Sequence, residues 1–304
     1  MRIPWEPTLD SERRPFPRIF LSASVPALER DQRFLTGPAE PRLMVRVIET
    51  RVRDAVASFV VHLLKNGGQL IFGGHPTIVP MVAAAARNFS PGQGEHRPIL
   101  LYQSEQFRTS SQSPAREEME RLGLAQIYWV PARPNEATKQ FDIDTPYLRD
   151  DQKFHALCEE EQRDQNTPAE LVAALVVLRV VMFLHLKPQA ILSMGGMEGI
   201  GSEASLFHKL LGWDFDHDKR HDAIQVRRAS RAFALKSTYG ATAQLQREGF
   251  HFIDENFFFR DDHSVRQELL RPQTDMALID KQLTDPIRYD GIMQDFVRTV
   301  ANTP

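Results

Sequence analysis

One stretch of the chain, residues 189–206, combines an apolar run with glycines and a carboxylate. The glycines are Gly195, Gly196, Gly199 and Gly201, and the carboxylate is that of Glu203. Glycine lets a turn adopt φ > 0 and lets the backbone approach a bound group closely. A helix that begins near Gly201 has free N–H groups in its first turn, where an anion is stabilised. Glu203 falls in that turn and would repel a phosphate, so it suits a ribose hydroxyl better. A tight turn without a ligand is the alternative interpretation.

The same order of strand, turn and helix recurs along the chain. The turns hold the candidate ligand contacts Ser22, Ser24, Gly73, Gly74, His75, Thr77, Gln103, Ser104, Gly195, Gly196, Met197, Glu198, Gly199, Ile200, Gly201, Ser202, Ser237, Thr238 and Gly240. His75 either contacts a ligand or packs within its turn. Because the carboxyl ends of parallel strands meet at one edge of a sheet, we expect these turns to lie together. Backbone donors, hydroxyls, an imidazole and a carboxylate suit a phosphorylated sugar or a nucleotide.

The sequence predicts neither a metal site nor a bound cofactor. His217 and His221 are four positions apart among several aspartates, but no cysteine joins them, and the segment has the charge of a solvated face. The chain has no Walker loop and no Gly-x-Ser-x-Gly elbow, and the spacing of Gly195, Gly196 and Gly199 is not that of a dinucleotide fingerprint.

The turns must be positioned by strands and helices that alternate along the chain. Strands are predicted at residues 18–22, 69–72, 98–102, 125–130 and 231–235 and in the apolar run after residue 189. Helices are predicted at 42–65, 78–87, 114–122, 148–163, 167–186, 201–211, 263–270 and 287–300. This order predicts an α/β fold, a doubly wound, Rossmann-like parallel sheet with helices on both faces and a helical C-terminal extension.

The domain prediction divides the chain into three parts. Residues 1–17 form an N-terminal arm, residues 18–249 form one Rossmann-like domain, and residues 250–304 form a helical extension packed on that domain. Within the domain, the largely polar excursion 131–166 is an insertion or a lid.

Composition excludes several classes of protein. The 304 residues are 42% hydrophobic and 25% charged with a net charge of −3, so nothing indicates binding to nucleic acid. The single cysteine, Cys158, allows no disulfide within the chain, fits a cytoplasmic location and is expected to be an unreactive thiol. The longest apolar run, 171–186, is interrupted by Arg179 and His185 and is short for a membrane span, so it predicts a buried helix.

With these turns identified, the sequence resembles the SLOG superfamily over residues 18–245. That superfamily includes the LOG-type nucleoside 5′-monophosphate phosphoribohydrolases and nucleotide-ligand sensor domains of bacterial conflict systems. Residues 19–24 resemble the opening strand and loop, and residues 71–76 resemble the second strand and its glycine turn. Residues 195–203 resemble the LOG phosphate motif, proline-glycine-glycine-x-glycine-threonine-x-x-glutamate.

The resemblance implies a catalytic pair of Arg179 and Glu203. In LOG enzymes an arginine on the preceding helix and the last glutamate of the motif form this pair, and Arg179 stands sixteen positions before Gly195. A carboxylate stabilises the positive charge that builds on the ribose when an N-glycosidic bond breaks, and an arginine holds the phosphate or the carboxylate. The alternative is that Arg179, which needs a partner in an apolar helix, pairs with a structural acid.

Departures from the motif favour binding without turnover. Met194 replaces the proline, Glu198 is an additional residue, and Ser202 stands near the expected threonine. We therefore expect a nucleotide-ligand sensor that recognises an ADP-ribose-like or cyclic nucleotide signal and works as a homo-oligomer or with an effector protein. The alternatives are a hydrolase that cleaves an N-glycosidic bond with Arg179 and Glu203, and a scaffold with a vestigial site.

Overall fold

The computed structural model describes residues 2–5, 17–35, 40–91, 96–108, 113–162, 167–211, 232–244 and 289–302. His217, His221, most of the arm and the helix predicted at 263–270 lie outside these residues.

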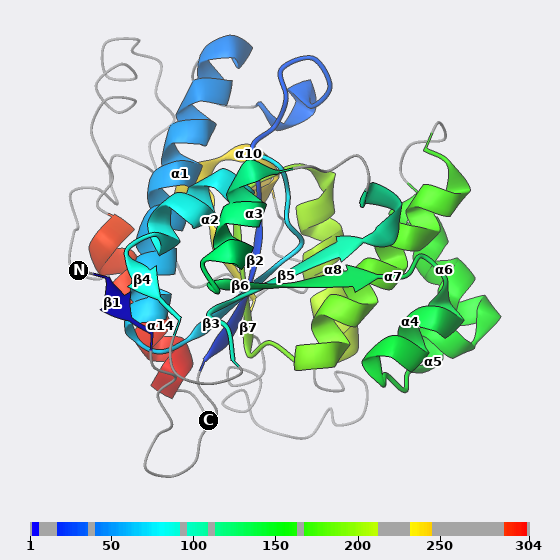
Figure 1. Ribbon diagram of the computed structural model, residues 1–304. Coiled ribbons are helices and arrows are strands. Elements are labelled where there is room, and N and C mark those ends of the chain that lie inside the picture. The colour runs from blue at the N-terminus through cyan, green and yellow to red at the C-terminus, as the bar shows by residue number, and fades with distance from the viewer. Residues whose placement is uncertain are drawn as a thin grey trace, which may run out of the picture.

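Six parallel strands form the central sheet (Figure 1). They are β2 (Arg18–Ser24), β3 (Gln69–Phe72), β5 (Ile99–Ser104), β6 (Ala125–Val130), β7 (Ala190–Gly195) and β8 (Ala232–Leu235). Their order across the sheet is β6-β5-β3-β2-β7-β8. From β2 the chain builds outward through β3, β5 and β6, and then returns to place β7 on the other side of β2. The boundary between β2 and β7 is therefore the topological switch point, where parallel α/β sheets bind their ligands.

The strands are apolar along their length because both faces of the sheet are covered. In β2, Ile19 and Leu21 belong to one hydrophobic core while Phe20 belongs to the other. Leu192 of β7 faces the first core and Ile191 faces the second. Side chains alternate between the two faces of a strand, so a sheet with two cores needs continuous apolar runs. The predicted doubly wound α/β fold is thus confirmed.

Four described helices cover the first face. They are α1 (Pro41–Lys65), α2 (Val79–Ala86), α3 (Pro114–Arg121) and α14 (Tyr289–Asn302). The C-terminal α14 lies along α1, where the ring centroids of Phe59 and Phe296 are 6.0 Å apart. The last helix is therefore part of the first core, which Figure 1 shows as the red helix beside α1.

The second face is covered by α7 (Ala169–Leu186), α8 (Glu198–Leu211) and three shorter helices of the excursion. The short helices are α4 (Pro134–Phe141), α5 (Pro146–Arg149) and α6 (Asp151–Glu161). Among the described helices, α7 is the one long and apolar enough to cross a membrane. It instead packs between the sheet and its neighbouring helices, and Val177, Val180 and Phe183 are fully buried there.

The start of the chain is held against the first core. A short strand, β1 (Ile3–Pro4), pairs in parallel with β4 (Phe89–Ser90). Trp5 is buried, and its indole Nε1 donates to the carbonyl of Gly68 at 3.0 Å. The sequence reasoning did not identify this anchor.

The helix after the glycine turn begins earlier than predicted. We expected its start near Gly201, but α8 begins at Glu198, which places Glu203 in the second turn rather than the first. Glycine disfavours a helix, but here packing prevails, because Ile200 is buried against Phe34 and Ala241.

Candidate functional site

Gly195 and Gly196 end β7 in a conformation that favours glycine. Their φ angles are +57° and +89°. A Cβ atom on Gly195 would lie 2.5 Å from a Val52 methyl and 2.8 Å from the Ser24 carbonyl oxygen, and a Cβ atom on Gly196 would overlap Ile200. Close internal packing therefore accounts for both glycines.

The N–H groups of these two glycines are bonded within the protein. The N–H of Gly195 donates to the Thr238 hydroxyl at 2.7 Å, and the N–H of Gly196 donates to the carbonyl of Ser24 at 2.7 Å. Both residues are buried behind the site and do not line the cleft described below. The available backbone donors of this turn are thus those at the very start of α8, before Ile200, whose N–H donates to the Met197 carbonyl at 3.1 Å.

The turn after β8 packs against the glycine turn of Gly195 and Gly196. It consists of a 3₁₀ segment (Lys236–Thr238), Tyr239 and the start of α10 (Gly240–Gln244). Thr238 is fully buried and also donates to the carbonyl of Leu235 at 2.6 Å. Gly240 has φ of +65°, and a Cβ atom there would lie 2.6 Å from the carbonyl carbon of Gly195. The predicted contacts Ser237, Thr238 and Gly240 therefore lie beneath the site, not along the cleft.

Two further elements hold this supporting turn. Arg51 of α1 donates to the carbonyl of Ser237 at 2.9 Å and lies over the ring of Tyr239 at 4.8 Å. The Ser237 hydroxyl lies 3.3 Å from that of Tyr289, at the start of α14. Burial raises the pKa of Tyr289 to about 12, so this hydroxyl stays protonated. The C-terminal helix is thus connected to the glycine turn.

A cleft of about 1330 Å³ opens at the carboxyl ends of β2, β3 and β5. The predicted residues that line it are Ser24, Gly73, Gly74, His75, Gln103, Ser104, Arg179, Met197, Gly199, Ile200 and Glu203. Ser22 and Thr77 contact lining residues, Ser202 lines a smaller adjoining cavity, and Glu198 and Gly201 belong to the first turn of α8.

The carboxylate of Glu203 is held between two of the predicted residues. The Ser22 hydroxyl donates to its Oε2 atom, and Arg179 Nε lies 3.6 Å from its Oε1 atom. Burial raises the pKa of Glu203, and the Arg179 charge and the Ser22 hydrogen bond oppose that rise. A buried carboxylate with fixed oxygens can accept hydrogen bonds from the hydroxyls of a ligand.

Arg179 lies between two carboxylates. It forms an ion pair with Glu161 of α6 as well as with Glu203, and its side chain is 10% exposed. Burial by itself lowers the pKa of Arg179, but the two carboxylates reverse this effect and the net shift is upward. Arg179 thus contacts both Glu203, the glutamate of the motif, and a second acid, Glu161. These contacts fit either interpretation of Arg179, as a member of the implied catalytic pair or as the partner of a structural acid. We call Arg179, Glu161 and Glu203 the inner end of the cleft.

His75 is a neutral side chain whose tautomer is fixed by its turn. The Val25 N–H donates to the Thr77 hydroxyl at 3.2 Å, and that hydroxyl lies 2.9 Å from Nδ1 of His75. The Thr77 N–H also donates to Nδ1 at 3.4 Å, so Nδ1 is an acceptor and Nε2 carries the proton of the neutral ring. Burial, together with the nearby Arg30 charge, lowers the pKa of His75 to about 4. His75 is thus an uncharged hydrogen-bond donor at neutral pH.

Gln103 is fixed by an arginine that the sequence did not single out. Arg116 of α3 donates to the Gln103 side-chain oxygen at 2.6 Å, and its guanidinium lies 5.3 Å from the Trp129 ring centroid. The arginine therefore orients the amide of Gln103, which lines the cleft.

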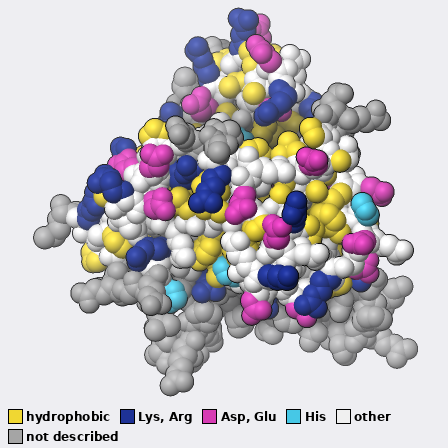
Figure 2. Space-filling model, turned by 45° about the vertical axis from the view of Figure 1, so that its right-hand side comes forward, with side chains coloured by type: hydrophobic (Ala, Val, Ile, Leu, Met, Phe, Trp, Pro, Cys, Tyr) yellow, Lys and Arg dark blue, Asp and Glu magenta, His cyan; other side chains and the backbone are white. Residues whose placement is uncertain are grey.

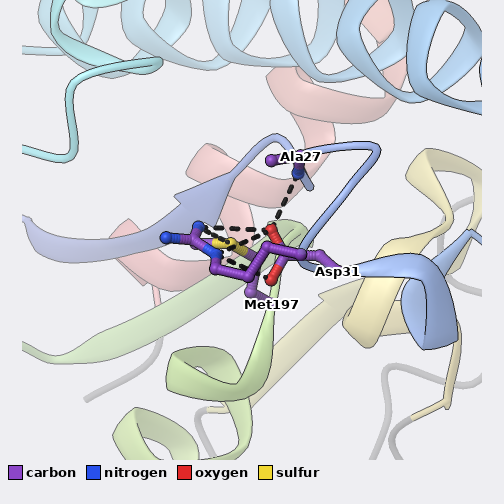
Figure 3. A network of polar contacts seen from close by, with 4 residues as sticks. Ala27, Asp31 and Met197 are labelled. Atoms are coloured by element: carbon purple, nitrogen blue, oxygen red, sulfur yellow. Dashed lines mark hydrogen bonds and ion pairs between the residues drawn. The ribbon is translucent and has the colours of Figure 1, made fainter. Parts of the chain in front are cut away.

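Three residues of the loop after β2, which we call the outer end of the cleft, line it on this side: Arg30, Asp31 and Arg33. Figure 3 shows Asp31 in a network of polar contacts that includes Ala27 and Met197. Arg30 Nε lies 3.1 Å from Asp31 Oδ1, and Arg30 Nη2 lies 3.0 Å from the Met197 sulfur. Asp31 also accepts from the Ala27 N–H at 2.8 Å. These contacts hold the loop next to the start of α8.

The sequence reasoning missed Glu161 and this outer end. Glu161 could have been suggested by two features of the sequence. Arg179 needs an acidic partner because it lies in an apolar helix, and a glutamate-rich segment comes just before that helix. The outer end lies in a loop without periodicity, so no pattern of residue types indicates it.

Comparison with known families gives one match. The family model of the SLOG cluster3 family matches residues 47–127. This segment runs from α1 into β6 and contains the turn of Gly73, Gly74 and His75, while residues 195–203 lie beyond it. No curated protein and no solved structure matches the chain.

Proposed function

From membership of the SLOG superfamily, which the match over residues 47–127 supports, we propose that this protein binds a nucleotide-derived ligand in its cleft. The ligand we infer is an ADP-ribose-like or cyclic nucleotide signal. The protein then acts as a sensor in a bacterial defence or conflict system.

The observation that carries the proposal is the position of Glu203 at the switch point of the sheet. Its carboxylate is fixed by Ser22 of β2 and Arg179 of α7, and it lines the cleft beside the first turn of α8. Fixed acceptor oxygens fit ribose hydroxyls, and the positive end of a helix fits a phosphate. A ribose phosphate presents both groups a few bonds apart.

The size of the cleft favours a ligand larger than one mononucleotide. Its volume of about 1330 Å³ exceeds the roughly 300–1,000 Å³ that is usual for small-molecule sites. Apolar side chains such as Val79, Leu175 and Met182 also line it and offer surfaces to a base. An ADP-ribose-sized molecule would use this space better than AMP.

A sensor also needs a way to pass on the signal. Glu161, in a helix of the excursion 131–166, contacts Arg179 at the inner end, so a ligand bound there would act on α6. We propose that this contact transmits binding to a second copy of the chain or to an effector protein in the cytoplasm.

One observation favours a second candidate function, hydrolysis of an N-glycosidic bond. Glu203 and Arg179 are in contact, as the LOG pair requires, and the carboxylate faces a cleft wide enough for a nucleotide. In that function Glu203 stabilises the positive charge that develops on the ribose.

A single experiment on the purified protein separates the two. AMP, NAD, ADP-ribose and cyclic ADP-ribose isomers are added to the wild type and to Glu203→Gln, and thermal unfolding and release of free base are measured on the same samples. A ligand at 100 times its dissociation constant stabilises the fold by about 2.7 kcal/mol. Glu136→Gln is the matched control, since this exposed glutamate also pairs with an arginine.

A stabilised wild type without products supports the sensor, and Glu203→Gln should then bind more weakly. Free base that disappears in Glu203→Gln, but not in Glu136→Gln, supports the hydrolase. If no compound changes the unfolding of the wild type, the nucleotide proposal is wrong.

A further inference from the structure

Two neighbouring turns of the cleft carry side-chain N–H donors that the protein itself does not use. The turns follow β3 and β5, which pair in parallel with Phe72 opposite Leu101. His75 stands three positions after Phe72, Gln103 stands two positions after Leu101, and both line the cleft. The carboxyl ends of the two strands therefore bring an imidazole and an amide to the same part of the cleft.

The amide of Gln103 has a fixed orientation. A guanidinium only donates hydrogen bonds, so the 2.6 Å contact with Arg116 places the amide oxygen toward Arg116 and the NH₂ group away from it. The NH₂ group lies beside Gly74, because a Cβ atom on that glycine would be 3.0 Å from Gln103 Nε2.

This NH₂ group also lacks an acceptor. Gln103 is 7% exposed, yet its Nε2 atom has no hydrogen-bond partner within the part of the chain that the structure describes. An unpaired buried donor costs free energy, so the acceptor must come from the cleft, either from water or from a ligand.

His75 supplies a second donor, its Nε2–H group. The Thr77 hydroxyl and N–H lie 2.9 and 3.4 Å from Nδ1, so the proton of the neutral ring is on Nε2. A protonated ring carries a proton on Nε2 as well, so this atom is a donor in either state. No hydrogen bond from the described residues reaches His75 Nε2.

Apolar groups beside these donors suit the face of a planar ring. A Cβ atom on Gly73 would lie 3.6 Å from the Met182 sulfur, so Met182 packs against the same turn. Phe72 and Val79, on either side of the turn, also line the cleft. Uncharged donors with apolar neighbours fit a nucleobase better than a phosphate, whose charge is better matched by cations.

Purine bases differ in what they present to a pair of donors. Guanine has two adjacent acceptors, N7 and O6, whereas adenine has the acceptor N7 next to the N6 donor. Two fixed donors therefore match guanine, and also hypoxanthine, which shares N7 and O6. With adenine, one donor of the protein would face a donor of the base.

Charge over the wider surface does not make this distinction. Figure 2 shows Lys and Arg side chains interspersed with Asp and Glu over the face in view. Adenine and guanine nucleotides carry the same phosphates, so an electrostatic field would attract both equally. The choice between them depends on contacts with the base.

We propose that Gln103 and His75 form a base-recognition subsite that selects guanine or hypoxanthine over adenine. This inference rests on the proposed function and makes it more specific: the ligand is a cyclic guanine nucleotide or the guanine counterpart of ADP-ribose. Adenine compounds are weaker ligands of the same cleft. Arg116 is a positioning residue, because it fixes the amide of Gln103.

Nucleotides that differ only in the base test the subsite. Binding of GMP, IMP, AMP and 7-deaza-GMP is measured by titration calorimetry, with cyclic GMP and cyclic AMP in parallel. GMP and IMP should bind at least about tenfold more tightly than AMP, which corresponds to about 1.4 kcal/mol. The 7-deaza analogue should also bind about tenfold more weakly than GMP, because a C–H group replaces N7.

Gln103→Glu changes the donor into an acceptor at nearly constant shape. One carboxylate oxygen can keep the Arg116 contact, and the other replaces the NH₂ group. The ratio of GMP affinity to AMP affinity should fall at least about tenfold. The added negative charge acts on the shared phosphate of both ligands, so it does not change this ratio.

Gln106→Glu is the matched control. Gln106 is exposed, stands three positions after Gln103 and does not line the cleft. The change adds the same charge nearby but leaves both donors in place, so the ratio of the two affinities should stay as in the wild type. Thermal unfolding of each variant checks that the fold is intact.

The outcomes separate this inference from the proposed function. If the wild type binds AMP as tightly as GMP, the base-recognition subsite is wrong and nucleotide binding stands. If the wild type prefers GMP but Gln103→Glu keeps the ratio, or Gln106→Glu lowers it equally, the role of Gln103 is refuted. If no nucleotide of either base binds, the proposed function fails together with this inference.

Discussion

Arg179 Nε lies 3.6 Å from Glu203 Oε1, and the same guanidinium pairs with Glu161. These contacts join three helices, because Arg179 is in α7, Glu203 in α8 and Glu161 in α6. The arginine is therefore both part of the candidate site and the charge that allows two carboxylates to be buried in one place.

We predict that Arg179→Met lowers the free energy of unfolding by about 3–5 kcal/mol at pH 7.5, because it leaves two largely buried carboxylates, 16% and 18% exposed, without a cation. Without the arginine, burial raises the folded-state pKa of Glu203 further, because the charge that opposes this rise is gone. A raised folded-state pKa contributes stability that is present at low pH and lost as the pH rises through it. The loss of unfolding free energy caused by Arg179→Met, measured by urea unfolding, should thus be smaller at pH 5 than at pH 7.5.

Arg133→Met is the control for this change, with an effect within about 1 kcal/mol at either pH. The double variant Arg179→Met/Glu203→Gln should recover part of the loss. An Arg179→Met penalty that is equal at both pH values would contradict the paired-carboxylate explanation.

We predict that Gly240→Ala destabilises the protein severely, while Gly291→Ala does not. Gly240 combines φ of +65° with a Cβ position 2.6 Å from the Gly195 carbonyl carbon. Gly291 lies in α14, and a Cβ atom there would meet nothing within 4 Å. Alanine in an open helical position is worth about 0.5–1 kcal/mol over glycine. Unfolding midpoints should therefore move in opposite directions, and a stable Gly240→Ala would show that the turn can shift.

We predict that His75 makes the fold less stable as the pH falls from about 6.5 toward 4. The unfolded side chain binds a proton with an ordinary pKa near 6.5, whereas the folded one resists protonation until about pH 4. The unfolded state thus binds more protons in this window, so stability rises with pH, by at most about 3 kcal/mol over the whole window.

The difference in unfolding free energy between the wild type and His75→Gln isolates this contribution. The unfolding free energy of the wild type minus that of His75→Gln should decrease by up to about 3 kcal/mol between pH 6.5 and 4. The same difference should stay constant above pH 7. A difference that does not depend on pH would mean that His75 titrates normally.

We predict that Cys158 reacts slowly with iodoacetamide at pH 7.5. Burial and the nearby Glu161 raise the pKa of its thiol to about 11, and the thiolate is the reactive form. Mass spectrometry of alkylated protein should show slow labelling in the folded state and fast labelling in urea. Equal rates in both would show an accessible, ordinary thiol.

Much of the fold follows from local pattern in the sequence. The apolar strands 69–72 and 125–130 match β3 and β6, and helix 42–65 differs from α1 by one residue. These elements are long or are bounded by glycine and proline, so local signals define them. The order of the strands could not be derived, because the neighbours β2 and β7 are brought together by contacts between distant residues.

The site was less accessible to sequence reasoning than the fold. Glycine at 195, 196 and 240 was interpreted as room for a ligand, but in the structure these residues pack against one another and against neighbouring atoms. A glycine pattern does not distinguish these two uses. The positions of Glu161 and Arg30 at the cleft could not be predicted either. They depend on contacts with residues that are distant in the sequence, Arg179 and Met197 respectively.

The pairing of Ser24 with Gly195, and the support of that glycine by Thr238, have a consequence for synthesis of the chain. A nascent chain that ends at residue 186 has β2 and β3 but lacks β7 and the glycine turn after it, so one wall of the cleft is missing. A chain that ends at residue 211 has the glycine turn without the residues beneath it. The ribosome must therefore pass residue 240 before the cleft can close around a ligand, so binding requires that β8 and the turn after it have already been made.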